Sequence, residues 1–166
     1  MFKINLKKIF LNLIIVLAIF FIDRASKIYI LNILELKNSV DIYINTYLNF
    51  YLIWNKGIAF GILSLEETFA YNLITAAITI ITIIVLILCF KNRGLKRYCF
   101  MSILGGSMGN LFDRWYYSAV PDFIDFHINQ FHWFIFNVAD IFITLGIVCL
   151  IYAEIFLDKG KNEKII

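Results

Sequence analysis

The sequence predicts an all-α membrane protein with four transmembrane helices and a small extracytoplasmic β element. Two observations lead to this prediction. Of the 166 residues, 61% are hydrophobic and only 16% are charged, whereas a soluble domain carries about 25% charged residues. The mean hydropathy is +0.82. A chain this apolar has too little polar surface to face water on all sides, so we expect a lipid bilayer to surround much of it.

Four segments predict the spans, at residues 9–27, 69–90, 98–116 and 138–157. The clearest is 69–90, which has no charged residue and is long enough, at ~1.5 Å per residue, to cross a ~30 Å hydrocarbon core. The third span contains three glycines and several polar residues, which are costly in lipid and therefore indicate a special role. Without repeats or linkers, residues 1–166 form one integral membrane domain in this interpretation.

The charges divide between the two ends of the predicted spans. Ten of the 15 basic residues lie before the first span, between the second and third, or after the fourth. Nine of the 12 acidic residues lie toward the other side. The positive-inside rule therefore places both termini in the cytoplasm and the acidic side outward. This asymmetry also explains the net charge of +3 without a nucleic-acid partner.

Two other interpretations of the sequence are weaker. The basic N-terminus and the following apolar stretch resemble a secretory signal peptide, but residues 20–27 contain charges where a small-residue cleavage site would be needed. We therefore expect an uncleaved span. Cys89, Cys99 and Cys149 fall in or beside spans, which favours apolar packing over a disulfide or a metal site.

Residues 40–54 predict the extracytoplasmic β element. Tyr, Ile, Phe and Leu alternate in part with polar residues there, which is typical of strands. Asn55, Lys56 and Gly57 follow as a turn signal. The aromatic side chains suit the headgroup interface, either as a surface anchor without a direct role or as contacts for a substrate.

Polar residues gather at the outward ends of the spans. Asp23 and Lys27 are one helical turn apart and can pair on one face, either to anchor the helix or to build a site. Asn55 and Gly57, taken alone, indicate only a turn. Polar side chains at this depth are unusual enough to make the outward end a candidate site.

The third span carries a second polar group. Asn110, Asp113 and Arg114 share one helical face, where an ion pair between the adjacent Asp113 and Arg114 is the simplest explanation. Gly105 and Gly109 have the spacing that lets helices approach closely in lipid. We expect this face to shape a site.

Asp122 and Asp140 are the candidate catalytic carboxylates. Asp122 is expected in a short loop after the third span, and Asp140 opens the fourth. Asn137, three residues before Asp140, is placed as a helix N-cap, so capping alone is the simpler explanation of Asp140. The 17 intervening residues allow the two carboxylates to converge.

Two close carboxylates share a proton, because both cannot ionise cheaply. The ionised member can take a proton from a water that attacks a peptide carbonyl, and the protonated member can polarise that carbonyl and then protonate the leaving amine. The helix N-terminus favours the charged form of Asp140, so we expect Asp122 to hold the proton at rest. Spacing alone does not choose Asp122 over Asp125 or Asp113.

The sequence lacks the residue patterns expected of a metal site or of a transporter. His127 and His132 lie near Asp125 but are five residues apart without a recognised ligand pattern, so we expect no metal and no cofactor. A transporter would place polar residues across the bilayer, whereas here they gather at one end. An anchoring protein, in which the aspartates are only caps and ion pairs, is the remaining alternative.

Five motifs in order resemble those of the lipoprotein signal peptidases (signal peptidase II). They are Asp-x-x-Ser-Lys, Asn-x-Gly-x-Ala-Phe-Gly, Gly-Asn-x-x-Asp-Arg, Val-x-Asp-Phe-Ile-Asp and Phe-Asn-x-Ala-Asp, at residues 23–27, 55–61, 109–114, 120–125 and 136–140. Each is weak alone, but together they cover most of the chain and are specific.

The resemblance implies an aspartic endopeptidase of the bacterial inner membrane, with both termini cytoplasmic and the active site at the outer face. Its substrates would be diacylglyceryl-modified prolipoproteins in contact with membrane lipid, cleaved before the lipidated cysteine, and globomycin would inhibit it. The resemblance makes Asp122 and Asp140 the catalytic pair. It implies binding or supporting roles for Asp23, Lys27, Asn55, Gly57, Asn110, Asp113, Arg114, Val120, Asn137 and Ala139.

The chain departs from the family pattern at three places. Arg24 stands where glutamine is usual, Ser26 where threonine is commoner, and Pro121 where a second valine is usual. The proline stiffens the approach to Asp122 and removes a backbone donor, so it bears on the local geometry and not on the carboxylate.

Overall fold

The computed structural model describes residues 6–57, 68–129 and 131–157. Two strands follow the first helix, and two more separate the third helix from the fourth. In chain order the elements are α1 (Leu6–Lys37), β1 (Asp41–Asn45), β2 (Leu48–Asn55), α2 (Thr68–Lys91), α3 (Gly94–Tyr117), β3 (Val120–Ile128), β4 (Phe131–Phe136), α4 (Val138–Tyr152) and a π-helical turn, η2 (Ala153–Leu157).

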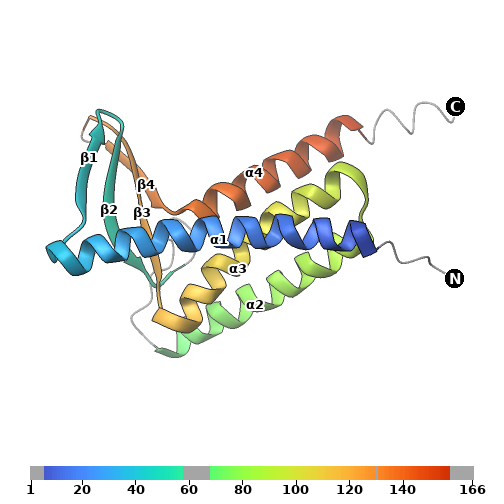
Figure 1. Ribbon diagram of the computed structural model, residues 1–166, viewed down its shortest axis with the longest axis horizontal. Coiled ribbons are helices and arrows are strands. Elements are labelled where there is room, and N and C mark those ends of the chain that lie inside the picture. Colours follow the sequence, from blue (N-terminus) through green and yellow to red (C-terminus); the bar gives the residue numbers. More distant parts are fainter. Residues whose placement is uncertain (1–5, 58–67, 130, 158–166) are drawn as a thin grey trace, which may run out of the picture.

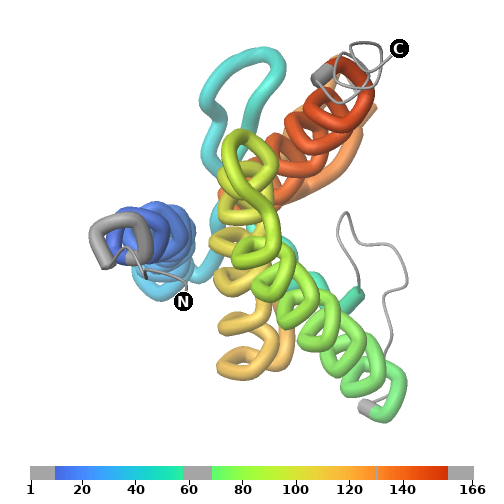
Figure 2. Tube along the Cα trace, turned by 90° about the vertical axis from the view of Figure 1, so that its right-hand side faces the viewer, coloured from blue at the N-terminus to red at the C-terminus, as the bar shows by residue number. Residues whose placement is uncertain are grey.

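The helices form an elongated bundle with the sheet at one end (Figure 1). The start of α1, the turn between α2 and α3 and the end of α4 lie at the opposite end. Seen along its length, α3 is central, and α1, α2 and α4 lie around it (Figure 2). Side chains of α3 can therefore reach each of the other helices.

Glycines of α3 allow this close packing. A Cβ atom on Gly109 would lie 2.5 Å from Oδ2 of Asp23 in α1, and one on Gly105 would lie 2.8 Å from another α1 side chain. On the α4 side, a Cβ on Gly106 would lie 2.5 Å from the carbonyl oxygen of Ala139. These separations are too short for a side chain. The close helix approach predicted from Gly105 and Gly109 is therefore present in the fold.

The outer surface of the bundle is strongly apolar. Large hydrophobic side chains are exposed along the helices, among them Phe21, Ile22, Ile80, Ile84, Phe90, Leu145 and Val148. Within the described residues, Phe69–Lys91 and Val138–Phe156 are long and apolar enough to cross a membrane. The mainly helical fold is confirmed, and the count of four spans stays a prediction.

The sheet is larger than the sequence predicted. Its four antiparallel strands lie in the order β1-β2-β3-β4, so the strands expected at residues 40–54 are joined by two more. The predicted loop around Asp122 is wrong, because Asp122 lies in β3, where it pairs with Ile53 of β2. Phe and Ile alternating with polar residues favour a strand there, and β2 offers the edge on which it pairs.

The sheet packs on the C-terminal part of α1. Ile30 of α1, Val40 and Phe123 of β3 form a buried apolar cluster. Phe123 and Asp122 are neighbours in a strand, so their side chains point to opposite faces. Packing of Phe123 on α1 therefore fixes the direction in which Asp122 points.

Candidate active site

Asp122 and Asp140 lie in the wall of one cavity, with a volume of about 250 Å³. Their residues are only 3% and 6% exposed. Strand β3 supplies Asp122, and the first turn of α4 supplies Asp140. The wall of this cavity, as far as the described residues form it, contains neither Asp113 nor Asp125. The fold thus separates the two candidate carboxylates from the others, which spacing alone could not do.

Asn137 contacts both aspartates. Its Nδ2 donates to Oδ1 of Asp122 at 2.6 Å, and its backbone N–H donates to Oδ2 of Asp140 at 3.1 Å. Its Oδ1 accepts from the backbone N–H of Asp140, which completes a capping box at the start of α4. The predicted N-cap is confirmed, and the cap also fixes the position of Asp122 relative to Asp140.

Two further amides complete the carboxylate environment. Asn55 donates from Nδ2 to Oδ2 of Asp122 at 2.8 Å. Asn110 donates from Nδ2 to Oδ1 of Asp140 at 2.8 Å. Each aspartate therefore accepts a hydrogen bond on both oxygens, so both carboxylates are held in fixed orientations.

Lys27 lies behind this layer and is fully buried. Its Nζ donates to Oδ2 of Asp23 at 2.8 Å, to Oδ2 of Asp113 at 2.7 Å and to Oδ1 of Asn110 at 2.8 Å. The predicted pair of Asp23 and Lys27 is confirmed. A buried ammonium needs such partners, and here they tie α1 to α3. The bond to Asn110 also orients the amide that donates to Asp140.

Asp113 and Arg114 do not form the ion pair suggested by their adjacency. Asp113 accepts from Lys27 and from Nη1 of Arg24, while Arg114 donates from Nη2 to the carbonyl oxygen of Gly57. Neighbouring residues in a helix point about 100° apart, so the two side chains reach different elements. Arg24 was missed as a site-supporting residue. The sequence signals were its place one turn from Lys27 and its departure from the family pattern within the first motif.

The end of β2 is joined to the site through its own polar groups. The backbone N–H of Gly57 donates to Oδ1 of Asn55 at 2.8 Å. Tyr71 of α2, also missed from the sequence, donates its hydroxyl to the carbonyl oxygen of Arg114 at 3.1 Å. Val120, paired with Asn55 across β2 and β3, lines the cavity. The rest of the predicted 55–61 motif, residues 58–61, lies outside the described residues.

Asp23 links α1 to the start of α4. Its Oδ1 accepts from the backbone N–H of Ala139 at 2.9 Å. That N–H belongs to the first turn of α4, where it has no partner within the helix. Of the predicted site residues, seven line the cavity: Asn55, Asn110, Arg114, Val120, Asp122, Asn137 and Asp140. Gly57 and Lys27 each bond to a residue of its wall, and Asp23 and Asp113 are linked to it through Lys27.

Burial and the neighbouring Asp140 raise the pKa of Asp122 to about 7, against the opposing hydrogen bonds from Asn55 and Asn137. An isolated aspartate has a pKa of about 3.9. Asp122 therefore keeps its proton to a higher pH than an isolated aspartate does, which suits a group that donates a proton during the reaction.

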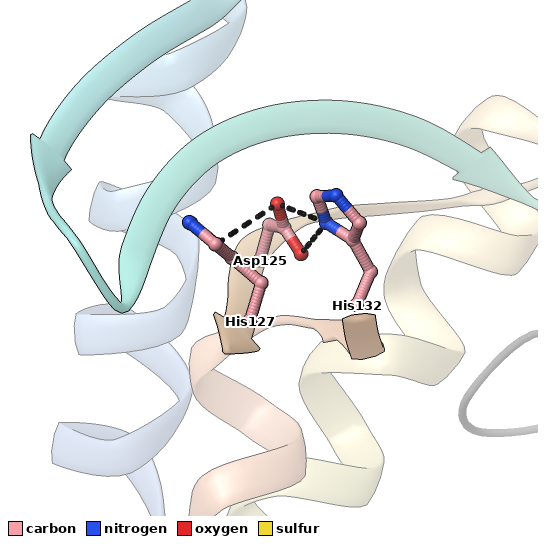
Figure 3. A group of neighbouring side chains, drawn as sticks. All are labelled: Asp125, His127 and His132. Carbon is pink, nitrogen blue, oxygen red and sulfur yellow. Dashed lines mark hydrogen bonds and ion pairs between the residues drawn. The ribbon is translucent and has the colours of Figure 1, made fainter. Parts of the chain in front are cut away.

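Asp125 belongs to a different group of side chains. It lies with His127 and His132 on β3 and β4 (Figure 3). The separation of five residues, which argued against a metal site, is no obstacle here because the two histidines are directly opposite on paired strands.

Comparison with known proteins identifies relatives over almost the whole chain. Residues 15–156 match the family model described as signal peptidase (SPase) II. The chain is 54% identical over 163 residues to a lipoprotein signal peptidase of Pelagibacter ubique (strain HTCC1062), covering 98% of both chains. It is 36% identical over 159 residues to one of Francisella tularensis subsp. novicida (strain U112), covering 93% of this chain and 95% of that one.

The fold has relatives among solved structures as well. A bacterial membrane enzyme solved at 2.3 Å matches with a TM-score of 0.69 and 26% identity, over 91% of this chain and 90% of that one. The resemblance drawn from the five motifs and the predicted enzyme class are thereby confirmed. The chain belongs to the signal peptidase II family and is a membrane peptidase of that family.

Proposed function

We propose that Asp122 and Asp140 are the catalytic pair and cleave the signal peptide from diacylglyceryl-modified prolipoproteins, immediately before the lipidated cysteine. The observation that carries the proposal is the double contact of Asn137, which donates to both carboxylates at the wall of one cavity. Two buried carboxylates held together in this way suit hydrolysis with a shared proton.

The surroundings of the two aspartates support different roles for them. Asp140 accepts a hydrogen bond from the backbone N–H of Asn137 at the start of α4, where the helix dipole favours negative charge. Asp140 is thus the base that takes a proton from the attacking water. Asp122, with its pKa raised to about 7, donates its proton to the carbonyl oxygen. The tetrahedral intermediate then collapses: the C–N bond breaks as Asp140 gives the proton taken from water to the leaving amine. A hydroxyl of the intermediate returns a proton to Asp122 as the new carboxyl group forms.

A second cavity beside the first suits the lipid of the substrate. It has a volume of about 380 Å³. Asp140 and Thr144 line both cavities. Its other lining residues are apolar: Phe126, Trp133, Phe134, Phe136, Ile141 and Leu145. Acyl chains in this cavity and in the surrounding membrane lipid would leave the peptide near the dyad, which explains a requirement for lipid modification.

The charge distribution supports the proposed placement of the protein. Residues 1–166 would form one domain with four spans in the bacterial inner membrane, with both termini in the cytoplasm. The sheet, whose strand β3 carries Asp122, lies at the end of the bundle opposite the start of α1 and the α2–α3 turn (Figure 1). The active site would then face outward, where lipidated substrates arrive. A peptide inhibitor such as globomycin would occupy the same cavity.

Cleavage by the purified full chain in detergent tests this proposal. The substrate is a prolipoprotein with a diacylglyceryl cysteine, and the control substrate has the same sequence without the lipid. We expect mass spectrometry to show one cut, before the cysteine, in the lipidated substrate only. Globomycin should prevent that cut.

Matched variants distinguish a loss of the catalytic carboxylates from a general effect of removing an acidic residue. Asp122→Asn and Asp140→Asn should leave the substrate uncut, while Glu35→Gln, an exposed carboxylate change on α1, should cut it as well as the wild type. Equal cleavage of the two substrates would contradict the lipid requirement, and cleavage by both aspartate variants would contradict the catalytic pair.

A further inference from the structure

We propose that Asp125, His127 and His132 form a binding site for a divalent transition-metal ion, and that Zn²⁺ suits their donor atoms. The three residues lie on the strand pair β3 and β4 (Figure 3). None of them lines the cavity that contains Asp122 and Asp140. The proposal does not depend on the peptidase mechanism.

The strands bring the three side chains together. His127 of β3 is directly opposite His132 of β4, and Asp125 lies two residues before His127. Nδ1 of His132 is 2.9 Å from Oδ1 and 2.8 Å from Oδ2 of Asp125. Nδ1 of His127 is 3.5 Å from Oδ2 of Asp125. One ligand atom from each residue can be chosen so that all lie within 4.8 Å of one another.

These separations are close to those of a metal site. Zinc binds imidazole nitrogens and carboxylate oxygens at about 2.0–2.2 Å in a tetrahedral arrangement, which places neighbouring ligand atoms roughly 3.3 Å apart. The imidazole rings lie 5.1 Å apart at 29° to each other. Small rotations of the side chains would direct both Nδ1 atoms at an ion beside the Asp125 carboxylate.

A buried, unpartnered nitrogen points to a ligand. His127 is only 8% exposed, and its Nδ1 has no hydrogen-bond partner among the described residues. Such a group costs stability unless something satisfies it. Nδ1 of His132 contacts the Asp125 carboxylate at hydrogen-bond distance, whereas Nδ1 of His127 lies 3.5 Å from Oδ2 of Asp125, within ion-pair range but without a hydrogen bond. An ion shared by the three residues satisfies both histidines.

A cavity next to the cluster gives an ion access and further oxygen donors. Its volume is about 390 Å³, and Asp125 and His132 line it together with Asp41 and Asn49. Oδ1 of Asn49, which lies opposite Asp125 on β2, is also buried without a partner in the described part of the chain. Asn49, Asp41 or water can supply the fourth ligand. Two histidines and one carboxylate with an open fourth position are a known zinc donor set.

The ion would join β3 to β4 close to the active site. Asp125 follows Asp122 by three residues, about 10 Å along a strand, and β4 leads directly to Asn137. A metal at this place cannot reach the reacting atoms. It would instead hold together the two strands that position Asp122 and the cap of α4.

Zinc binding is measured on the full chain in detergent, without a polyhistidine tag. We expect equilibrium dialysis with metal analysis to give one Zn²⁺ per chain. The double variant His127→Ala/His132→Ala and the single variant Asp125→Asn should weaken binding by at least about 100-fold, because even outer-shell changes cost ~10–100-fold. Glu35→Gln, which removes one exposed carboxylate charge elsewhere, should bind as the wild type does.

If a variant fails to fold, spectroscopy of the wild-type protein still tests whether the two histidines bind the ion. The chain has only two histidines, so Zn²⁺ should shift both sets of imidazole resonances in the NMR spectrum at one equivalent. Bound Co²⁺ should show no thiolate charge-transfer band, because the three cysteines lie elsewhere. Imidazole signals unmoved by zinc, a thiolate band, or unchanged binding in the double variant would overturn the proposal.

Discussion

At the scale of single residues, the side chain of Asn137 makes two separate contacts that each fix part of the site. Its side-chain oxygen caps α4, and its side-chain nitrogen donates to Asp122. The same residue fixes the helix that presents Asp140 and the orientation of the opposing carboxylate. The sequence predicted the cap from the spacing of three residues. It could not predict the second contact, because that contact depends on β3.

Replacing Asn137 separates the two contacts. Asn137→Ala loses the cap and should lower stability by about 1 kcal/mol as well as activity. Asn137→Ser keeps an uncharged oxygen for the cap but has no amide to donate to Asp122, so it should retain more stability and still lose activity. Thermal unfolding and kcat/KM check both variants. Full activity in Asn137→Ser would show that the contact to Asp122 is dispensable.

The raised pKa of Asp122 predicts the pH dependence of cleavage. Asp122 must be protonated to act as the acid, so kcat/KM should fall as the pH rises through about 7. Asn55→Ala removes a hydrogen bond to the ionised form and should move this fall to higher pH. A pH profile of kcat/KM for both proteins checks the prediction, and the same alkaline limb in both would contradict it.

The raised pKa of Asp122 also makes the free energy of unfolding depend on pH. The pKa of Asp122 is about 7 in the folded protein and about 3.9 in the unfolded chain, so the native state binds the proton more tightly. The stabilisation is complete below about pH 3.9 and is lost as the pH rises through about 7. Denaturation of wild type and Asp122→Asn at several pH values isolates this contribution, which the asparagine variant should lack.

At the scale of elements, α3 determines the geometry of the site. Its glycines bring α1 and α4 into contact, and its Asn110 and Asp113 receive Lys27. Local patterns in the sequence predicted the helices and the close approach at Gly105 and Gly109. The sequence did not predict β3, β4 or the partner of Asp113. Both strands and the contact of Asp113 depend on which segments lie close together in the folded chain. Local periodicity in the sequence carries no information about such contacts.

Gly109→Ala tests the close approach of α1 and α3. The new Cβ would lie 2.5 Å from Oδ2 of Asp23, so Asp23 must move away from Lys27 and Ala139. We expect a stability loss of about 1–3 kcal/mol and reduced cleavage. Met108→Ala, an exposed neighbour on α3, is the control and should have little effect. Wild-type stability in Gly109→Ala would contradict the packing argument.

At the scale of the whole molecule, the two ends of the bundle differ in chemistry. Buried carboxylates and amides gather at the end that bears the sheet. At the other end, the start of α1 and the turn between α2 and α3 carry Lys and Arg. This polarity could be predicted from the sequence, because it depends only on the order of charges along the chain. A bilayer across the apolar middle accounts for both ends.

Cysteine labelling in spheroplasts tests the orientation. In a variant without the three native cysteines, Tyr43→Cys on β1 should react with a membrane-impermeant maleimide. Arg93→Cys, in the turn between α2 and α3, should react only after the membrane is permeabilised. Both positions are exposed, so a reversed pattern would reflect topology and would contradict the proposed orientation.

The central claim, that Asp122 and Asp140 act as one catalytic unit, is tested most directly by kcat/KM of the two single variants and the double variant with asparagine. Each single variant should lose at least about 100-fold. The double variant should be little worse, because residues that act as a unit are not additive. All three should keep the wild-type thermal unfolding cooperativity. Cleavage near the wild-type rate in either folded single variant would contradict the account.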